Sequence, residues 1–454
     1  MSRRPGGGAP DDTAIDELLL YVHVPFCRKR CDYCDFFGVA GAGRRIMEQT
    51  VNSTLEDLQG ELNRLQPGRV PSVFFGGGTP SHLGYKLLAR LVERVVTAGQ
   101  AVAVGGPAAR AVAGGEPAPV PAANKQDRDA ARTMPAVATE VTVELNPEDV
   151  DAELVTVLGE SGVTRVSVGV QSFDRARRRS IGRAAWEHPA ERALELLAGR
   201  FALNVDLISS LPRQSTGQNG VSREIEAINA DVTRARSFGV EHLSVYSLTL
   251  DDTRRGVLAR LDDGVFFDNN EEADIDEAVH ATIEGHGLRR YEISAYAVPG
   301  AECRHNLGYW NMMPYLGVGP GAVSTLPGGP TGVQRTKRVE RLSPEAGHGP
   351  EIEVESVQPR EFLEDVLLMG LRLTDGIDRR RFRQIFGAEL WEFAPVTYGR
   401  WQDAGLMATT PTHYRPGPGF HALLNSRLTE IFAEIGEPSP GSSPRRRLPR
   451  RPSY

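Results

Sequence analysis

Three of the four cysteines in this 454-residue chain stand close together, at a spacing that suits metal chemistry. Cys27, Cys31 and Cys34 follow the pattern C-x3-C-x2-C. Thiolates are soft ligands for iron–sulfur clusters, zinc or copper(I). Three neighbouring cysteines cannot all pair as disulfides, and a structural zinc site normally needs a fourth cysteine or histidine. Because Phe36 and Phe37 follow instead, the spacing favours an iron–sulfur cluster over a zinc site or a chance grouping.

The number of cysteines also bears on what such a cluster could do. A [4Fe-4S] cluster has four irons, so three thiolates leave one iron open to bind another molecule. An open coordination position is typical of reactive metal sites, whereas structural sites are closed. The sequence therefore predicts a cluster that binds a further ligand.

Composition is that of an ordinary globular protein, with 40% hydrophobic residues and a formal charge of −7. This acidic balance gives no reason to expect nucleic acid as a partner. A few cysteines grouped as ligands fit a reducing compartment, so we expect a cytoplasmic location. We see no signal peptide and no apolar run of the roughly 18 residues that a membrane span needs.

Strand and helix patterns alternate from residue 18 to residue 284. Short apolar runs predict strands at 18–24, 70–75, 140–145, 165–170, 203–208 and 242–248. Helical spacing of apolar residues predicts helices at 45–65, 85–98, 152–160, 189–198, 223–237 and 272–284. Such alternation implies a parallel sheet covered by helices. Six units rather than eight suggest a partial (β/α)6 barrel.

Polar and glycine residues follow the predicted strands, where α/β folds build their sites. The turn Gly76–Pro80 would let a ligand approach the backbone, but it lacks the Lys-Ser/Thr pair of a phosphate loop. Carboxylates such as Glu144 and Asp206 can accept hydrogen bonds from ribose hydroxyls, and Arg183 can hold a carboxylate through two N–H groups. The alternatives are an ordinary tight turn for the glycine segment, and strand-end side chains that simply face water.

Several blocks together resemble the oxygen-independent coproporphyrinogen III oxidase family of the radical S-adenosylmethionine (SAM) superfamily. The blocks are YVHVPFC at Tyr21, FGGGTPS at Phe75, ELNP at Glu144, SVGVQSFD at Ser167, NVDLI at Asn204 and YLGVGPGA at Tyr315. The resemblance implies a radical SAM barrel with a [4Fe-4S] cluster on Cys27, Cys31 and Cys34. It implies SAM binding by Tyr21, Tyr33, Gly77, Gly78, Thr79, Glu144, Gln171, Arg183 and Asp206.

Two branches of that family differ at positions visible here. True oxidases carry a further cysteine two positions after the motif, where this chain has Phe36. The heme chaperone branch, HemW, has an H-N-x-x-Y-W block, which this chain carries at His305, Asn306, Tyr309 and Trp310. The resemblance implies that these four residues bind heme, which is then passed to an unidentified acceptor protein. The alternatives are a packed core role for the block, an oxidase that converts coproporphyrinogen III to protoporphyrinogen IX, and a binding module with a structural cluster.

The domain layout is expected to have a large core and a small second domain. We expect a flexible N-terminus at 1–16, a radical SAM core at 17–326 with a low-complexity insertion at about 100–139, a linker at 327–357, a C-terminal domain at 358–436 and a disordered basic tail at 437–454. The C-terminal domain should be mainly helical, with helices at 361–373, 379–386, 389–403 and 423–435. A weak contact of the basic tail with an anionic membrane surface is a further expectation.

Overall fold

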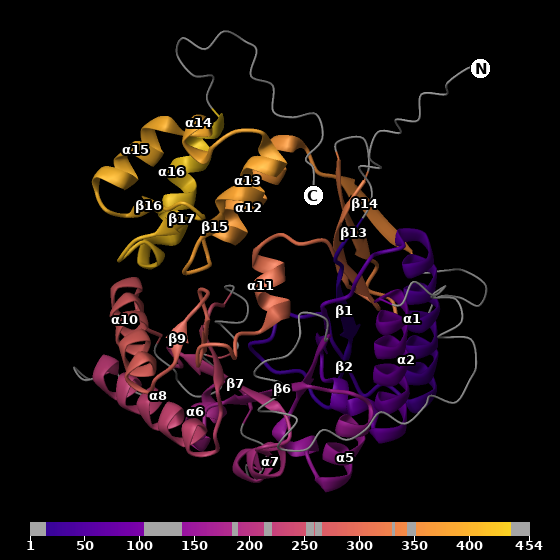
Figure 1. Cartoon of the computed structure of the whole chain (residues 1–454). Helices are drawn as coiled ribbons and strands as arrows, with labels where there is room; N and C mark the ends of the chain where they lie inside the picture. The colour runs from indigo at the N-terminus through magenta and orange to yellow at the C-terminus, as the bar shows by residue number, and fades with distance from the viewer. Residues whose placement is uncertain are drawn as a thin grey trace, which may run out of the picture.

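The structure is a computed structural model, and it describes residues 15–103, 139–183, 189–212, 220–250, 258, 266–328, 332–342 and 351–436. Residues 1–14 of the expected flexible N-terminus, the insertion from 104 to 138 and the basic tail lie outside the described residues. A large α/β unit and a smaller unit formed by the last part of the chain make up the described protein (Figure 1).

A sheet of twelve strands, ordered β14-β13-β12-β11-β1-β4-β5-β6-β7-β8-β10-β9, forms the centre of the large unit. Seven neighbouring strands form a continuous parallel set. One is β11 (Tyr315–Val318), and the other six belong to the predicted units: β1 (Leu19–Val24), β4 (Ser72–Gly77), β5 (Glu140–Leu145), β6 (Arg165–Gln171), β7 (Ala202–Ser209) and β8 (His242–Ser247). The predicted partial barrel of six strand–helix units is thereby confirmed.

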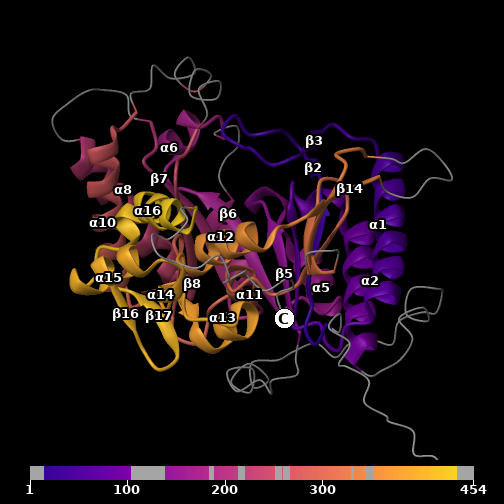
Figure 2. The same cartoon turned by 90° about the horizontal axis from the view of Figure 1, so that it is seen from above.

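Helices cover one face of this parallel set (Figure 2). They are α1 (Arg44–Leu65), α2 (Tyr85–Ala103), α5 (Ala152–Glu160), α6 (Arg175–Ser180), α7 (Ala190–Leu197), α8 (Gly220–Ser237) and α10 (Asn269–Gly285). Local sequence fixes several of their starts. Asp151 accepts a hydrogen bond from Leu154 N at the start of α5, and Asp268 forms a capping box with Glu271 at the start of α10.

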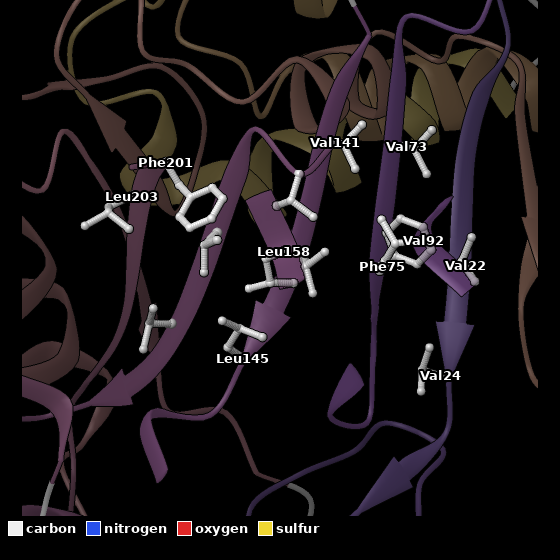
Figure 3. Close-up of a cluster of buried hydrophobic side chains, with 14 of the residues drawn as sticks. Val22, Val24, Val73, Phe75, Val92, Val141, Leu145, Leu158, Phe201 and Leu203 are labelled. Carbon is white, nitrogen blue, oxygen red and sulfur yellow. The ribbon is translucent and has the colours of Figure 1, made fainter. Parts of the chain in front are cut away.

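Side chains along each parallel strand alternate between the helices and the barrel interior. Figure 3 shows Val73 and Phe75 of β4 on the same side of the sheet as Val92 of α2, and all three are buried. The residues between them, such as Phe74, face the interior, because successive side chains of a strand point to opposite faces. The outward face supplies the core, so the inward face is free to carry polar groups.

Five further strands extend the sheet beyond the parallel set. They are β12 (Val323–Pro327), β13 (Val333–Arg338) and β14 (Ile352–Ser356) next to β11, and β10 (Ala295–Ala297) and β9 (Arg289–Arg290) next to β8. The expectation of a linker at 327–357 is wrong for β13 and β14. Arg338 of β13 is buried and pairs with Asp57 of α1, which fixes this strand to the core.

The C-terminal unit contains helices and a small sheet. Its helices are α12 (Pro359–Gly370), α13 (Arg379–Phe386), α14 (Leu390–Phe393), α15 (Pro395–Asp403) and α16 (Leu424–Gly436), with a 3-10 turn at His421–Leu423, and its strands are β15 (Ile377–Asp378), β16 (Met407–Thr409) and β17 (His413–Pro416). The prediction of a single helix over 389–403 is wrong, because α14 and α15 are separate helices. Ala394 has φ −143° and ψ 65°, outside the helical region, because the following proline disfavours that region.

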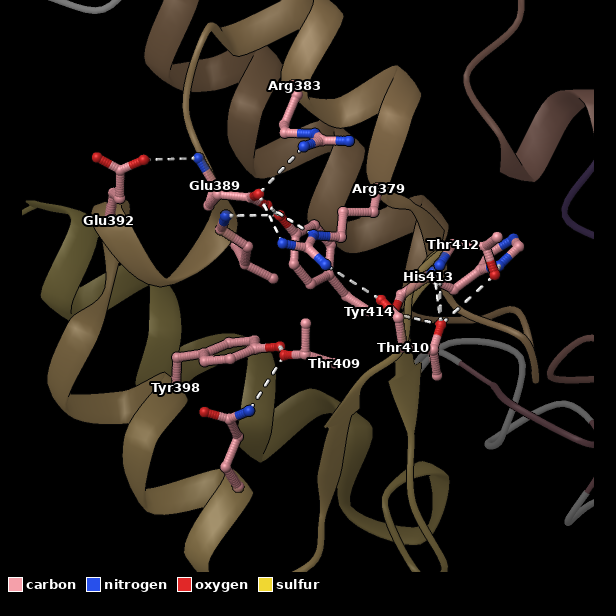
Figure 4. Close-up of polar contacts among 12 residues, drawn as sticks. Arg379, Arg383, Glu389, Glu392, Tyr398, Thr409, Thr410, Thr412, His413 and Tyr414 are labelled. Atoms are coloured by element: carbon pink, nitrogen blue, oxygen red, sulfur yellow. Dashed lines mark hydrogen bonds and ion pairs between the residues drawn. The ribbon is translucent and has the colours of Figure 1, made fainter.

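A polar network holds the C-terminal sheet to its helices (Figure 4). Arg379 at the start of α13 donates to both oxygens of Glu389, at 3.0 and 2.8 Å, and Tyr414 of β17 donates to the same carboxylate. Tyr398 of α15 shares a hydrogen bond of 2.5 Å with Thr409 of β16.

Among the described residues, no helix has both the length and the apolar content to cross a membrane.

Candidate functional site

A cavity of about 550 Å³ opens at the carboxyl ends of the parallel strands. Its walls include eleven of the twelve residues predicted to hold the cluster and SAM, namely Cys27, Cys31, Tyr33, Cys34, Gly77, Gly78, Thr79, Glu144, Gln171, Arg183 and Asp206. Tyr21 is the exception. The structure therefore brings together residues from six separate segments, as expected for a parallel sheet whose strands all end at one edge.

The cysteine loop is held between two short paired strands, β2 (Phe26–Cys27) and β3 (Val39–Ala40). A hydrogen bond of 3.1 Å between His23 Nε2 and Phe37 O fixes the far end of the loop to β1. Burial raises the pKa of the Cys31 thiol, although Arg183 opposes the rise. Within the described residues, no three Cys, His, Asp or Glu side chains are grouped to ligate one metal ion. Thiolates of an iron–sulfur cluster need no such convergence, because each binds a different iron.

The glycine turn brings the end of β4 against the end of β1. Gly77 has φ +107°, and a Cβ there would lie 2.5 Å from His23 Nε2. A Cβ on Gly78 would lie 2.7 Å from Phe26 O, and the Gly78 amide donates to Val24 O at 2.9 Å. The glycines are thus required by contacts within the protein, and they position the cysteine loop as well as the cavity wall.

Two carboxyl groups line the cavity without a direct cationic partner among the described residues. Burial, and to a lesser degree Asp206, raise the pKa of Glu144 to about 8, although Glu144 accepts a hydrogen bond from Gly77 N at 3.2 Å. Asp206 is held by Ser167 Oγ at 2.8 Å and Asn204 Nδ2 at 2.7 Å, while burial raises its pKa. Buried carboxylates with spare lone pairs can accept hydrogen bonds from ligand hydroxyls.

Arg183 connects the cysteine loop to the end of β5. Its guanidinium donates to Tyr33 Oη at 3.2 Å and to Asn146 Oδ1 at 2.6 Å. Asn146 in turn donates to Thr79 Oγ1 at 3.1 Å. Although burial disfavours the charged form, Tyr33 and the nearby cysteine raise the pKa of Arg183. A bulge at the end of β6 places Gln171 in the left-handed region, φ +67°, which is a strained backbone of the kind found at functional sites.

The predicted heme-binding residues do not converge on one surface. They lie on α11 (Arg304–Trp310), which contacts β1 and β4. His305 is 7% exposed, shares a 2.9 Å hydrogen bond with Ser72 through Nδ1, and has its pKa lowered to about 3 by burial. Of the four predicted heme-binding residues, Asn306 is the one that lines the cavity.

The aromatic residues of the block lie at the other end of the helix. Tyr309 is 36% exposed and contacts Tyr315, while Trp310 lies under the guanidinium of Arg372 in the C-terminal unit. Tyr21 of β1 contacts the His305 ring, at a centroid distance of 6.5 Å. These positions join α11 to both units of the protein.

Sequence reasoning missed a polar network on the interior faces of β6, β7 and β8. Asn204 donates to Ser167 at 2.7 Å and to Ser244 at 3.0 Å, and its Oδ1 shares a 2.6 Å hydrogen bond with His242 Nδ1. His242 Nε2 lies 2.8 Å from Tyr291 Oη. The signal was present as polar residues at every second position of strands whose other residues are apolar.

Comparison with known proteins identifies the family. Residues 21–215 match the Radical SAM superfamily model, and residues 357–418 match the HemN C-terminal domain. The heme chaperone HemW of Escherichia coli is 32% identical over 68% of this chain and 70% of its own length. "Radical S-adenosyl methionine domain-containing protein 1, mitochondrial" of Bos taurus is 31% identical over 98% of this chain and 95% of its own length.

A solved structure shows the same fold. The coproporphyrinogen III oxidase HemN of Escherichia coli aligns with a TM-score of 0.65 and 18% identity, covering 93% of this chain and 90% of the oxidase chain. Heme chaperone HemW of Lactococcus lactis is also similar, at 30% identity over 81% of this chain and 84% of its own length. Two domain models match this chain, and its relatives align with both the large and the C-terminal unit. The chain therefore belongs to the radical SAM superfamily and, within it, to the HemW family.

Proposed function

We propose that this protein is a heme chaperone of the HemW type, which binds a [4Fe-4S] cluster, SAM and heme and delivers heme to an acceptor protein. The observation that carries the proposal is the convergence of the three loop cysteines, the glycine turn and two buried carboxyl groups on one cavity, in a chain with HemW relatives. The clustered cysteines suit a reducing compartment, so we propose a cytoplasmic location.

The residues around the cavity fit a cluster and SAM. Cys27, Cys31 and Cys34 would hold the cluster, and the remaining iron would bind the amino and carboxylate groups of SAM. Glu144 and Asp206 would accept hydrogen bonds from the ribose hydroxyls, and the burial of both carboxyl groups on the cavity wall supports this assignment. Arg183 would meet the SAM carboxylate with N–H groups left over from its bonds to the loop and to β5, since a guanidinium carries five.

The fit to heme depends on α11. A neutral imidazole is the form that binds a metal, and the lowered pKa of His305 keeps its ring neutral. The ring is nevertheless buried and bonded to Ser72 in this conformation. We therefore propose that heme first contacts the exposed ring of Tyr309, and that α11 must move before His305 becomes a ligand.

Phe36 weighs against the oxidase function. Its side chain is 65% exposed and lies at the cavity wall. In this position the resemblance places the further cysteine of true oxidases. A hydrocarbon ring cannot ligate a metal or react as a thiolate does, so the chain lacks a group that the oxidase pattern includes.

A heme titration of the anaerobically reconstituted protein tests the proposal. We expect a saturable shift of the Soret band at about one heme per chain, with the cluster absorbance unchanged. If no specific binding occurs and the protein instead turns over coproporphyrinogen III with SAM and a reductant, the chaperone proposal is overturned in favour of the oxidase.

Two variants locate the heme site. We expect His305→Ala to weaken heme binding while leaving the cluster intact. His421→Ala is the control, because the His421 ring is likewise shielded from solvent in part and hydrogen-bonded within the protein, to Leu371 O, but lies in the C-terminal unit. Equal heme affinity of the His305 variant and the unchanged protein would return His305 to a purely packing role.

A further inference from the structure

The cavity extends below the residues proposed to bind SAM. Thr142 lies two residues before Glu144 on β5, and Arg165 lies four residues before Gly169 on β6, and all four residues line the cavity. At about 3.3 Å per residue, the deeper residues lie roughly 7 to 13 Å closer to the amino ends of the strands. The cavity therefore has a floor, distinct from its mouth at the cysteine loop.

Strand register aligns the side chains of this floor. Phe74 of β4 is the neighbour of Thr142 on β5, and Thr142 is the neighbour of Arg165 on β6. Asn306 of α11 lines the same cavity and completes the floor. The α11 backbone is tied to this row through Glu140, which accepts hydrogen bonds from His305 N at 3.2 Å and from Arg165 Nε at 3.2 Å.

Two buried polar atoms of the floor lack a hydrogen-bond partner among the described residues. Thr142 Oγ1 and Arg165 Nη1 are buried with no partner, on residues 1% and 5% exposed. The half-buried Asn306 adds its side-chain amide to the wall of the same cavity. An unsatisfied buried polar group costs about 1–3 kcal/mol, so two on one cavity floor require an explanation.

The guanidinium of Arg165 is fixed in place. Its Nε donates to Glu140, and its Nη2 donates to Ala301 O at 2.9 Å and Glu302 O at 3.2 Å. These bonds prevent the group from turning to find another protein acceptor, so only Nη1 is left unsatisfied. A preorganised donor of this kind is typical of a binding site rather than of a packing contact.

Charge selects among possible ligands. Glu140 balances the charge of Arg165 at 3.2 Å, so the floor holds no excess positive charge. A carboxylate would therefore be buried there without a counter-charge, which is costly, whereas an uncharged carbonyl avoids that cost. A primary carboxamide supplies an oxygen for Arg165 Nη1 and both a donor and an acceptor for the Asn306 amide.

We infer that the cavity floor formed by Phe74, Thr142, Arg165 and Asn306 binds a small uncharged molecule with a primary carboxamide at the end of a short apolar chain. The carboxamide meets Arg165, Thr142 and Asn306, and the apolar chain packs on the ring of Phe74. This ligand is separate from SAM and from heme, and the inference does not depend on heme binding.

Propionamide and propionate are suitable probes, measured by saturation-transfer NMR on the reconstituted protein with SAM present. We expect propionamide to bind and propionate to bind much more weakly. Binding of propionate as tight as or tighter than that of propionamide would overturn the charge argument, and binding of neither probe would leave ordered water as the occupant and overturn the inference.

Variants at Thr142 separate recognition from folding. Thr142→Val removes the hydroxyl without changing the shape, so propionamide binding should weaken about tenfold, while Thr142→Ser keeps the hydroxyl and should keep most of the binding. Because the Thr142 hydroxyl has no partner, the valine variant should fold with equal or higher Tm. Thr156→Val, on the exposed face of α5, is the control and should change neither. Equal propionamide affinity in all variants would overturn the proposed floor site.

The heme titration separates this inference from the proposed function. A protein that binds propionamide but not heme would overturn the chaperone proposal alone. A protein that binds heme and loses no propionamide signal in Thr142→Val would overturn the floor site alone.

Discussion

The imidazole of His23 and the backbone of Gly77 are in such close contact that a Cβ on the glycine would lie 2.5 Å from Nε2. The same Nε2 shares the hydrogen bond with Phe37 O that fixes the cysteine loop. The glycine turn and the cysteine loop are therefore coupled through one histidine, so a change at one should be measurable at the other.

Gly77→Ala should displace His23 and weaken both cluster retention and SAM binding. We expect a loss of stability of about 1–3 kcal/mol, from the clash and the positive φ together, and less cluster absorbance after reconstitution. Gly239→Ala is the matched control, because Gly239 has φ +75° but nothing within 4 Å of its Cβ position, so it tests backbone strain alone. An alanine variant of Gly77 with full cluster absorbance would show that the contact does not position the loop.

Cys31→Ser should abolish the visible absorbance of a reconstituted cluster, because a serine hydroxyl is a poor substitute for a thiolate on iron. Cys303→Ser is the control, since Cys303 is buried beside Glu140, outside the loop, and its removal should leave the cluster absorbance in place. Full absorbance in the Cys31 variant would disprove the ligand assignment.

EPR of the reduced protein with and without SAM should show a shifted signal, and an unchanged signal would count against an open iron.

Glu144 should make stability fall as pH rises. Its folded pKa is raised to about 8 from 4.5, chiefly by burial, so the folded state holds the proton longer than the unfolded chain. Stability from this group is therefore fully present below about pH 4.5 and is lost as pH rises through about 8. Thermal unfolding of the SAM-free protein should show a flatter pH dependence in Glu144→Gln, and not in the exposed control Glu48→Gln. An unchanged slope would contradict the prediction.

SAM affinity should have the opposite pH trend. An ionised Glu144 accepts hydrogen bonds from ribose hydroxyls better than a protonated one, so SAM binding should strengthen as pH approaches 8. Titrations of SAM between pH 6 and pH 8.5, with Glu144→Gln as the comparison, check this. An identical trend in the two proteins would exclude Glu144 as the source.

Arg338→Met should destabilise the protein strongly. Arg338 of β13 is 2% exposed and donates to both oxygens of Asp57 on α1, at 2.5 and 3.0 Å. Removing one partner leaves a buried charge, which costs about 3–5 kcal/mol, and the double variant with Asp57→Leu should recover much of it. Arg341→Met, which breaks an exposed pair with Glu351, should change Tm little. Similar Tm values for the two single variants would contradict this role of the buried pair.

Local sequence was enough to find the six parallel units and the residues at their carboxyl ends. Apolar runs, helical spacing and capping residues act within a few positions of one another, so they can be read from the chain. Strands β13 and β14 were not predicted, because the glycines and prolines around them are typical of a linker. Their stability comes from contacts distant in sequence, such as that of Arg338 with Asp57. The break at Ala394 could have been predicted from Pro395, since a proline disfavours helix in the preceding residue.

The sequence by itself determined the grouping of the three loop cysteines, the parallel order of the units and the family, because these depend on residue type and spacing. Only the tertiary structure decided which side chains meet. It placed Asn306 on the cavity wall but buried His305 against Ser72, although the two are adjacent in sequence, because neighbouring residues of a helix point about 100° apart. It also joined Phe74, Thr142 and Arg165 into one floor, since strand register brings together residues that lie far apart along the chain.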